Sequence, residues 1–101
     1  MNRKESLLAM LHEQPNDPFL LYALALECHA QGEISNALSG LQQLRLKHPD
    51  YLPLYYTLGT WLDEQGLEEE AVQVLSEGIA LAHAQGSDKT RAELQAYLNA
   101  L

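Results

Sequence analysis

The stretch "LALECHAQGEISNALSGL", Leu24 to Leu41, decides the fold, because its pattern returns as "LGTWLDEQGLEEEAVQVL", Leu58 to Leu75. A fixed period of this kind indicates a repeat architecture in which each copy is one supersecondary unit. One such unit cannot bury its apolar face alone, so the copies are expected to stack and share a core. Every matched pair is offset by 34 residues: Leu24 with Leu58, Gln31-Gly32 with Gln65-Gly66, Ala37 with Ala71, and Leu41 with Leu75.

The apolar residues of both copies recur at helical spacing, i, i+3, i+4 and i+7, and do not alternate as they would in a strand. Gly32 and Gly66 follow the first apolar stripe of each copy. Because glycine commonly closes a helix in a left-handed conformation, each is predicted to hold a turn between two helices. Pro15 and Pro49 are predicted to end the second helix of their units, since proline cannot continue a helix interior.

Small residues occupy the places where the two helices of a copy are expected to approach each other. Ala37 and Ala71 lie early in the second helices, and Ala25 and Gly59 lie on the first helices. The single tryptophan, Trp61, falls between core positions and is expected to pack against a neighbouring helix, with a partly exposed contact as the alternative. These positions predict a helix-turn-helix unit in each copy.

This pattern resembles the tetratricopeptide repeat family, whose 34-residue signature reads W-x2-L-G-x2-Y, then A-x3-F, then P. The departures are exchanges of aromatic for aliphatic residues and His83 in place of the final proline, so the last repeat helix is expected to run to about Gln85. The first copy supplies Leu21, Leu24, Ala25, Cys28, Ala37, Leu41 and Pro49, and the second supplies Tyr55, Leu58, Gly59, Leu62, Ala71 and Leu75.

The resemblance implies an all-α fold: antiparallel helix-turn-helix repeats stacked as a short right-handed solenoid of about six helices. Leu7 and Pro15 lie 34 residues before Leu41 and Pro49, so the N-terminal segment resembles the second helix of a truncated repeat. Ser87 or Asp88 is expected to cap a closing C-terminal helix. A single domain over residues 1–101 is thus expected to comprise a half-repeat helix (1–16), repeat 1 (18–51), repeat 2 (52–85) and a capping helix (87–101).

Charge and composition exclude several classes of function. The net charge is −8; residues 1–50 carry four basic and six acidic side chains, and residues 51–101 carry two and eight. Without clustered Lys and Arg the chain is not expected to bind nucleic acid or an anionic membrane. The start "MNRKESLLAML" does not fit a signal peptide, and no apolar run approaches the roughly 20 residues of a membrane span. One cysteine, Cys28, allows no internal disulfide, which fits a reducing compartment, and we predict a cytoplasmic protein.

No residue pattern in the chain predicts catalysis, a cofactor or a metal. Cys28 and His29 are the only close pair of metal-ligand types, but adjacent helical residues point about 100° apart and rarely share a metal. The acidic run Glu68 to Glu70 is interpreted as a solvated first turn that the helix dipole favours. Ser39, Thr60 and Ser76 have no His and Asp in a recognisable nucleophile motif. The chain is therefore predicted not to be an enzyme.

In tetratricopeptide arrays the first helix of each repeat lines a concave groove, and the resemblance places a partner-binding groove here. The alternative is that the chain's own termini cover part of this surface. Lys and Asn, with which some members of the family clamp a C-terminal carboxylate, are missing from these helices, so we reject the subtype that binds chaperone tails. The candidate groove residues are Phe19, Tyr22, Leu26, His29, Tyr56, Thr60 and Asp63.

The sequence therefore predicts a non-catalytic protein–protein interaction module. Its partner would be a protein or peptide segment with apolar or aromatic side chains, flanked by basic residues that suit the acidic second half. The alternative is a self-associating repeat unit, a homodimer in which the groove or a repeat end packs on a second copy.

Overall fold

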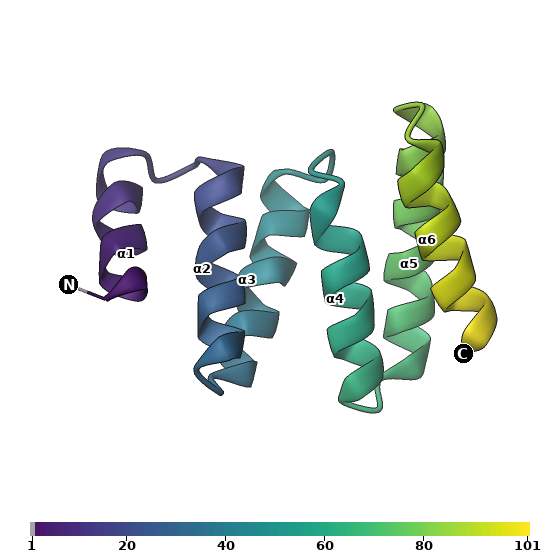
Figure 1. The fold of residues 1–101 in the computed structure, drawn as a ribbon, viewed down its shortest axis with the longest axis horizontal. Helices are drawn as coiled ribbons and strands as arrows, with labels where there is room; N and C mark the ends of the chain where they lie inside the picture. Colours follow the sequence, from purple (N-terminus) through teal and green to yellow (C-terminus); the bar gives the residue numbers. More distant parts are fainter. Residues whose placement is uncertain (1) are drawn as a thin grey trace. The chain divides into compact units, whose positions relative to one another are not determined.

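The computed structural model describes residues 2–101, and over that range the chain forms six α-helices (Figure 1). The predicted all-α fold of six helices is confirmed. The chain divides between Tyr51 and Leu52 into two compact units, which we call unit 1 and unit 2. That residues 1–101 form a single domain stays a prediction. Unit 1 contains α1 (Arg3–Glu13), α2 (Pro18–Ala30) and α3 (Ile34–Lys47), and unit 2 contains α4 (Pro53–Glu64), α5 (Glu68–Ala84) and α6 (Asp88–Ala100).

Local sequence signals explain where the first two helices begin. The Asn2 side chain accepts a hydrogen bond from the backbone N–H of Glu5 at 2.8 Å. The Asp17 carboxylate accepts from the N–H groups of Phe19 and Leu20, at 2.9 and 3.3 Å. A side-chain oxygen at the N-cap satisfies amides that the helix itself leaves unpaired. In α2 a proline follows the cap in the first helical turn, where its missing N–H costs nothing.

The two repeats close their helix pairs with the same glycine turn. Gly32 and Gly66 have φ angles of 81° and 78°, in the left-handed region, so the predicted turns are confirmed. Just beyond Gly66, Leu67 donates its N–H to the carbonyl of Leu62 at 2.9 Å, and the turn after α2 contains the equivalent bond at 2.9 Å. These bonds satisfy carbonyls at the end of the first helix and direct the chain into the second.

The end of α5 lies where the sequence predicted it, whereas the predicted cap at the start of α6 is confirmed only in part. Without a proline at position 83, α5 continues to Ala84 and Gln85 is its C-cap. Ser87 occupies the N-cap position of α6, as predicted, but its side chain makes no capping hydrogen bond. Ser87 also belongs to the preceding turn, in which its N–H donates to the carbonyl of Ala82 at 2.8 Å.

Each unit is built by helices that pack on their neighbours in the chain. In unit 1, α2 packs against α1 on one side and α3 on another, and in unit 2, α5 packs against both α4 and α6. The α1–α2 contact is a small apolar cluster of Leu7, Leu20 and Ala23, with Leu11 and Leu24 partly buried against it. Since α1 has only Leu7 fully enclosed, most of the α1 surface remains in contact with water.

Small residues allow the paired helices to approach closely. Ala37 and Ala71 are both fully buried, as predicted from the repeat. A Cβ built on Gly59 would lie 2.5 Å from Cδ2 of Leu75, so the bare α4 backbone there is filled by a leucine of α5. Trp61 is 7% exposed, which confirms that it packs inside the protein. No helix within residues 2–101 has the length and apolar character needed to cross a membrane.

Candidate functional site

Four of the seven predicted groove residues lie on a single face of α2 in unit 1. They are spaced three, four and three residues apart, which keeps them on one side of a helix. The neighbouring faces of α2 pack inside the protein: Leu20 and Ala23 belong to the α1 contact, and Ala25 and Cys28 are buried. The structure therefore brings one predicted set together on the remaining face, namely Phe19, Tyr22, Leu26 and His29.

The accessible part of this face is apolar. The Phe19 side chain is 63% exposed and Leu26 is 39% exposed, seven residues apart on the helix. Tyr22, between them, is half-buried, and its ring centroid lies 5.6 Å from that of Tyr51 at a tilt of 58°. Partial burial, the neighbouring Tyr22 and the charge of Asp17 raise the pKa of the Tyr51 hydroxyl. Because Tyr22 is packed on Tyr51, Phe19 and Leu26 are the residues that a ligand can reach most fully.

The other three predicted residues lie on α4 in unit 2, and α6 contacts two of them. The Tyr97 hydroxyl donates a hydrogen bond to Oδ2 of Asp63 at 2.7 Å. The Tyr97 ring meets Tyr56 edge-on, with centroids 5.8 Å apart and planes at 73°. Thr60 donates its hydroxyl to the carbonyl of Thr57 at 2.9 Å, within its own helix. That the α2 and α4 sets form one groove stays a prediction.

Tyr97 is the residue of this region that sequence reasoning missed. The bond to Asp63, followed by partial burial, raises the pKa of Tyr97 to about 12, because ionising the phenol would lose the hydrogen bond and place two anions together. A signal was available, since Tyr97 follows Asp63 by 34 residues, one repeat period. Through Tyr97, α6 contacts Asp63 and Tyr56. That a terminal segment covers part of a binding groove stays an alternative.

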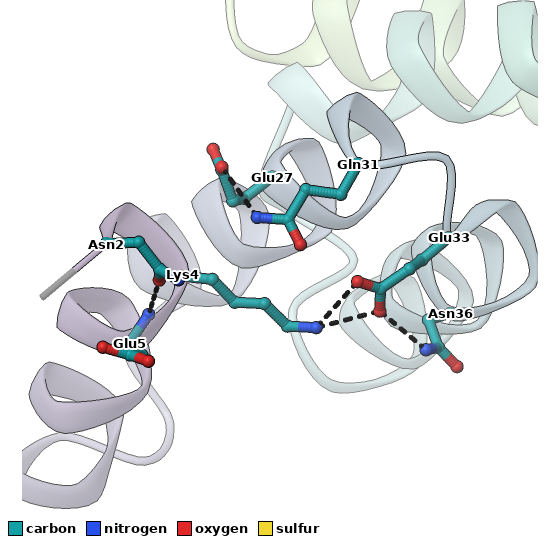
Figure 2. A network of polar contacts seen from close by, with 7 residues as sticks. All are labelled: Asn2, Lys4, Glu5, Glu27, Gln31, Glu33 and Asn36. Carbon is teal, nitrogen blue, oxygen red and sulfur yellow. Dashed lines mark hydrogen bonds and ion pairs between the residues drawn. The ribbon is translucent and has the colours of Figure 1, made fainter.

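A polar network fixes α1 on the rest of unit 1 (Figure 2). The Lys4 ammonium donates to both carboxylate oxygens of Glu33, each at 2.9 Å, and Asn36 donates to the same carboxylate at 3.1 Å. Arg3 forms a second ion pair with Glu27, at 3.5 Å. Hydrogen bonds from Lys4 and then Asn36 lower the pKa of the Glu33 carboxyl, and the bond to Glu33 raises the pKa of Lys4. Both basic side chains of α1 are thus paired with acidic residues of unit 1.

We expect the Glu33 carboxyl to titrate below 4.5, its ordinary value, when followed by carbon-detected NMR. Because the folded pKa is lowered, the Lys4 pair stabilises the fold fully above that ordinary value, and this contribution is lost as the pH falls through the folded pKa. Lys4→Met, which keeps the apolar stem, should move the midpoint back toward 4.5. Arg3→Met is the matched control and should leave it unchanged; equal shifts in both variants would contradict the pairing.

The cysteine, histidine and acidic side chains are the metal-ligand types in the sequence. Across residues 2–101, no group of three or more His, Cys, Asp or Glu side chains is arranged to hold a metal ion. Cys28 is a free and buried thiol on the face of α2 that lines the helix pair.

Comparison with solved structures identifies close similarities over most of the chain. The crystal structure of a tetratricopeptide repeat domain protein from Salinibacter ruber matches with a TM-score of 0.77 and 34% identity, over 81% of this chain and 91% of that one. The solution NMR structure of the Salinibacter ruber domain gives a TM-score of 0.80 at 34% identity, over 83% and 85%.

A third structure extends the similarity to almost the whole chain. The solution structure of a protein from Bordetella parapertussis has a TM-score of 0.82 and 27% identity, over 98% of this chain and 86% of that one. No protein-family model and no curated protein matched the chain.

Proposed function

Because this chain belongs to the tetratricopeptide repeat family, we propose that it is a non-catalytic module that binds a segment of another protein. The binding surface in this proposal is the concave, partly apolar groove to which the α2 and α4 residues contribute. The observation that supports it most is the exposure of Phe19, 63%, on a face of α2 that no other helix of unit 1 occupies. Phe19 shares this face with the exposed Leu26, and exposed apolar residues that gather on one face are typical of an interaction surface.

The chemistry of this surface suggests the kind of segment it would accept. Phe19 and Leu26 offer two apolar contacts two helical turns apart, which suits a partner with aromatic or branched aliphatic side chains. The net charge of −8 favours basic residues flanking those side chains, mainly through faster association. A cytoplasmic location is part of the proposal, since the only cysteine is a free thiol.

Phage-displayed random peptides selected on the whole chain would provide ligands, and fluorescence anisotropy would measure their affinity. We expect the double variant Phe19→Ser, Leu26→Ser to bind the selected peptides at least about 30-fold more weakly, because aromatic and aliphatic anchors contribute on the order of 2 kcal/mol at the centre of an interface. The variant should keep its helical circular dichroism, since neither side chain lies in the core.

Leu46→Ser is the matched control. Leu46 is also a large apolar residue of unit 1, 79% exposed, but it lies on α3 and outside the predicted groove. Its replacement should leave peptide affinity unchanged. Equal weakening by Leu46→Ser, or full binding by the Phe19, Leu26 double variant, would contradict the proposed surface.

Self-association is the second candidate, and the exposure of Leu8 and Met10 on α1 favours it. Two large apolar residues on a helix at the end of a repeat could pack on a second copy of the chain. Multi-angle light scattering over a wide concentration range separates the candidates. A stable dimer that dissociates in a Leu8→Ser, Met10→Ser variant would support self-association in place of peptide binding.

A further inference from the structure

In unit 2, α6 inserts one leucine into a notch between α4 and α5. Leu94 is fully buried, and it is the only side chain of α6 that is. The notch exists because Gly78 has no side chain: a Cβ built there would lie 3.1 Å from Cδ1 of Leu94 and 2.6 Å from Cβ of Tyr55. The shape of α5 at this point is therefore complementary to a leucine on the helix that packs against it.

The second anchor of α6 is Tyr97, three residues after Leu94 and so on the same side of the helix. Its hydroxyl donates to Asp63 at 2.7 Å and its ring packs edge-on against Tyr56. One apolar and one polar anchor at this spacing define the face that α6 presents. We call the complementary surface the α6 seat, formed by Tyr55, Tyr56, Asp63 and Gly78.

The α6 helix packs along α5 but buries few of its side chains. Six residues of α4 are buried, against one of α6. The N-cap residue of α6 makes no side-chain capping bond, and the ion pair between Arg91 and Asp88 lies within the helix at 3.6 Å. Elements with few buried contacts open at lower free energy than the rest of a domain. Opening of α6 is thus expected to be among the less costly motions of unit 2.

Unit 1 shows that the helix pair of a repeat can form a groove. Positions 34 residues before Tyr55 and Gly78 are Leu21 and Leu44, and both line an apolar pocket of about 430 Å³ between α2 and α3. Ala25 and Gly40 contribute to the same pocket. The corresponding seam of unit 2 is where Leu94 is buried. The helix pair of unit 1 therefore leaves apolar space at the positions that in unit 2 lie beside Leu94.

We propose that α6 acts as an intramolecular ligand and that its seat also accepts an amphipathic helix of a partner protein carrying Leu and Tyr three residues apart. The contacts of α6 specify this partner: leucine for the notch at Gly78, and a phenol that donates to Asp63 with its ring on Tyr56. The partner helix competes with α6, so its apparent affinity is reduced by the fraction of molecules in which α6 is closed. The proposal does not depend on the α2 surface and concerns unit 2 alone.

The probe is a fluorescently labelled synthetic peptide of residues 87–101, titrated into the full-length chain. Because the peptide competes with α6, the same substitution should have opposite effects on peptide affinity when it is made in the chain and when it is made in the peptide. Tyr97→Phe in the chain weakens the internal ligand, so the peptide should bind at least about fivefold more tightly than to the unaltered chain. The same Tyr97→Phe change in the peptide should weaken its binding to either chain by a similar factor.

Tyr51→Phe in the chain is the matched control, because it removes a phenol of unit 1, outside the seat, and should leave peptide affinity unchanged. The Phe19→Ser, Leu26→Ser variant should also bind the peptide normally, which separates this inference from the proposed function. Lack of peptide binding by the Tyr97→Phe chain up to about 1 mM would overturn the proposal. Two other results would also overturn the proposal. One is that the peptide binds the Tyr97→Phe chain and the unaltered chain with equal affinity. The other is that the Tyr97→Phe chain forms a dimer that the peptide does not dissociate.

Discussion

A Leu75→Ala variant is expected to lose about 2–5 kcal/mol of its free energy of unfolding, the usual cost of emptying a leucine site in a well-packed core. Leu75 is fully buried on α5 and fills the space above the bare backbone of Gly59. Both helices of the second repeat are held at this contact, so collapse around the missing atoms is limited. Urea denaturation followed by circular dichroism measures the change. The slope of the unfolding free energy against urea concentration should be the same in the variant and the unaltered protein.

Leu46→Ala provides the control for the first prediction. Leu46 is the same residue type on a helix of unit 1 but is 79% exposed, so its loss should change stability by no more than about 0.5 kcal/mol. A Leu75→Ala variant as stable as Leu46→Ala would show that the two helices of the second repeat do not pack through this leucine.

Gly59→Ala is expected to destabilise the protein by about 1–3 kcal/mol, although alanine is ordinarily the better helix former. Gly59 lies inside α4, where a change to alanine would by itself favour the helix. The new methyl group, however, would meet Cδ2 and Cγ of Leu75 at 2.5 and 2.7 Å. Because Leu75 is fully buried, its side chain has little room to move, and overpacking outweighs the gain in helix propensity. Thermal denaturation of the variant shows directly whether the substitution lowers or raises the stability of the protein.

Two comparisons isolate the cause of that loss. At Gly40, also inside a helix, an added Cβ would lie 3.4 Å from Cβ of Ala25, so Gly40→Ala should be neutral or stabilising. In a Leu75→Ala background, Gly59→Ala should lose its penalty, and the double-mutant cycle should give a coupling of at least about 1 kcal/mol. Additive effects of the two substitutions would mean that the helices do not meet here.

The regular parts of this fold could be predicted from the sequence because they depend on the repeat. Ala37 and Ala71 are fully buried, and Gly32 and Gly66 hold left-handed turns, as their places in the period require. A residue that recurs at 34-residue spacing meets the same surroundings in each copy, so two copies constrain each other. Helix ends could be predicted from proline and glycine, because these residues determine the backbone conformation at their own positions.

The irregular contacts could not be predicted, because they depend on how helices that are distant in sequence rotate against one another. Lys4 meets Glu33 across 29 residues, through a long side chain whose rotamer no local pattern determines. The 34-residue offset relates Tyr97 to Asp63 in the repeat, but the hydrogen bond between them depends on side-chain rotamers in the same way. In the candidate site, too, some features could be predicted from the sequence and others could not. Phe19 and Leu26 of the predicted groove are exposed, whereas Tyr22 packs on Tyr51 and is partly structural. That these residues bind a partner stays a prediction.

The measurement that tests the central proposal most directly is NMR chemical-shift mapping with a library-selected peptide, which an 11.3 kDa protein suits well. If the chain binds partner segments as proposed, backbone amide shifts and intermolecular contacts should concentrate on the accessible face of α2, at Phe19, Tyr22 and Leu26. Saturation of this surface should leave the amides around Leu46 on α3 unperturbed. Perturbations centred on Leu46, or on Val72 of α5, with the α2 face unchanged, would contradict the account.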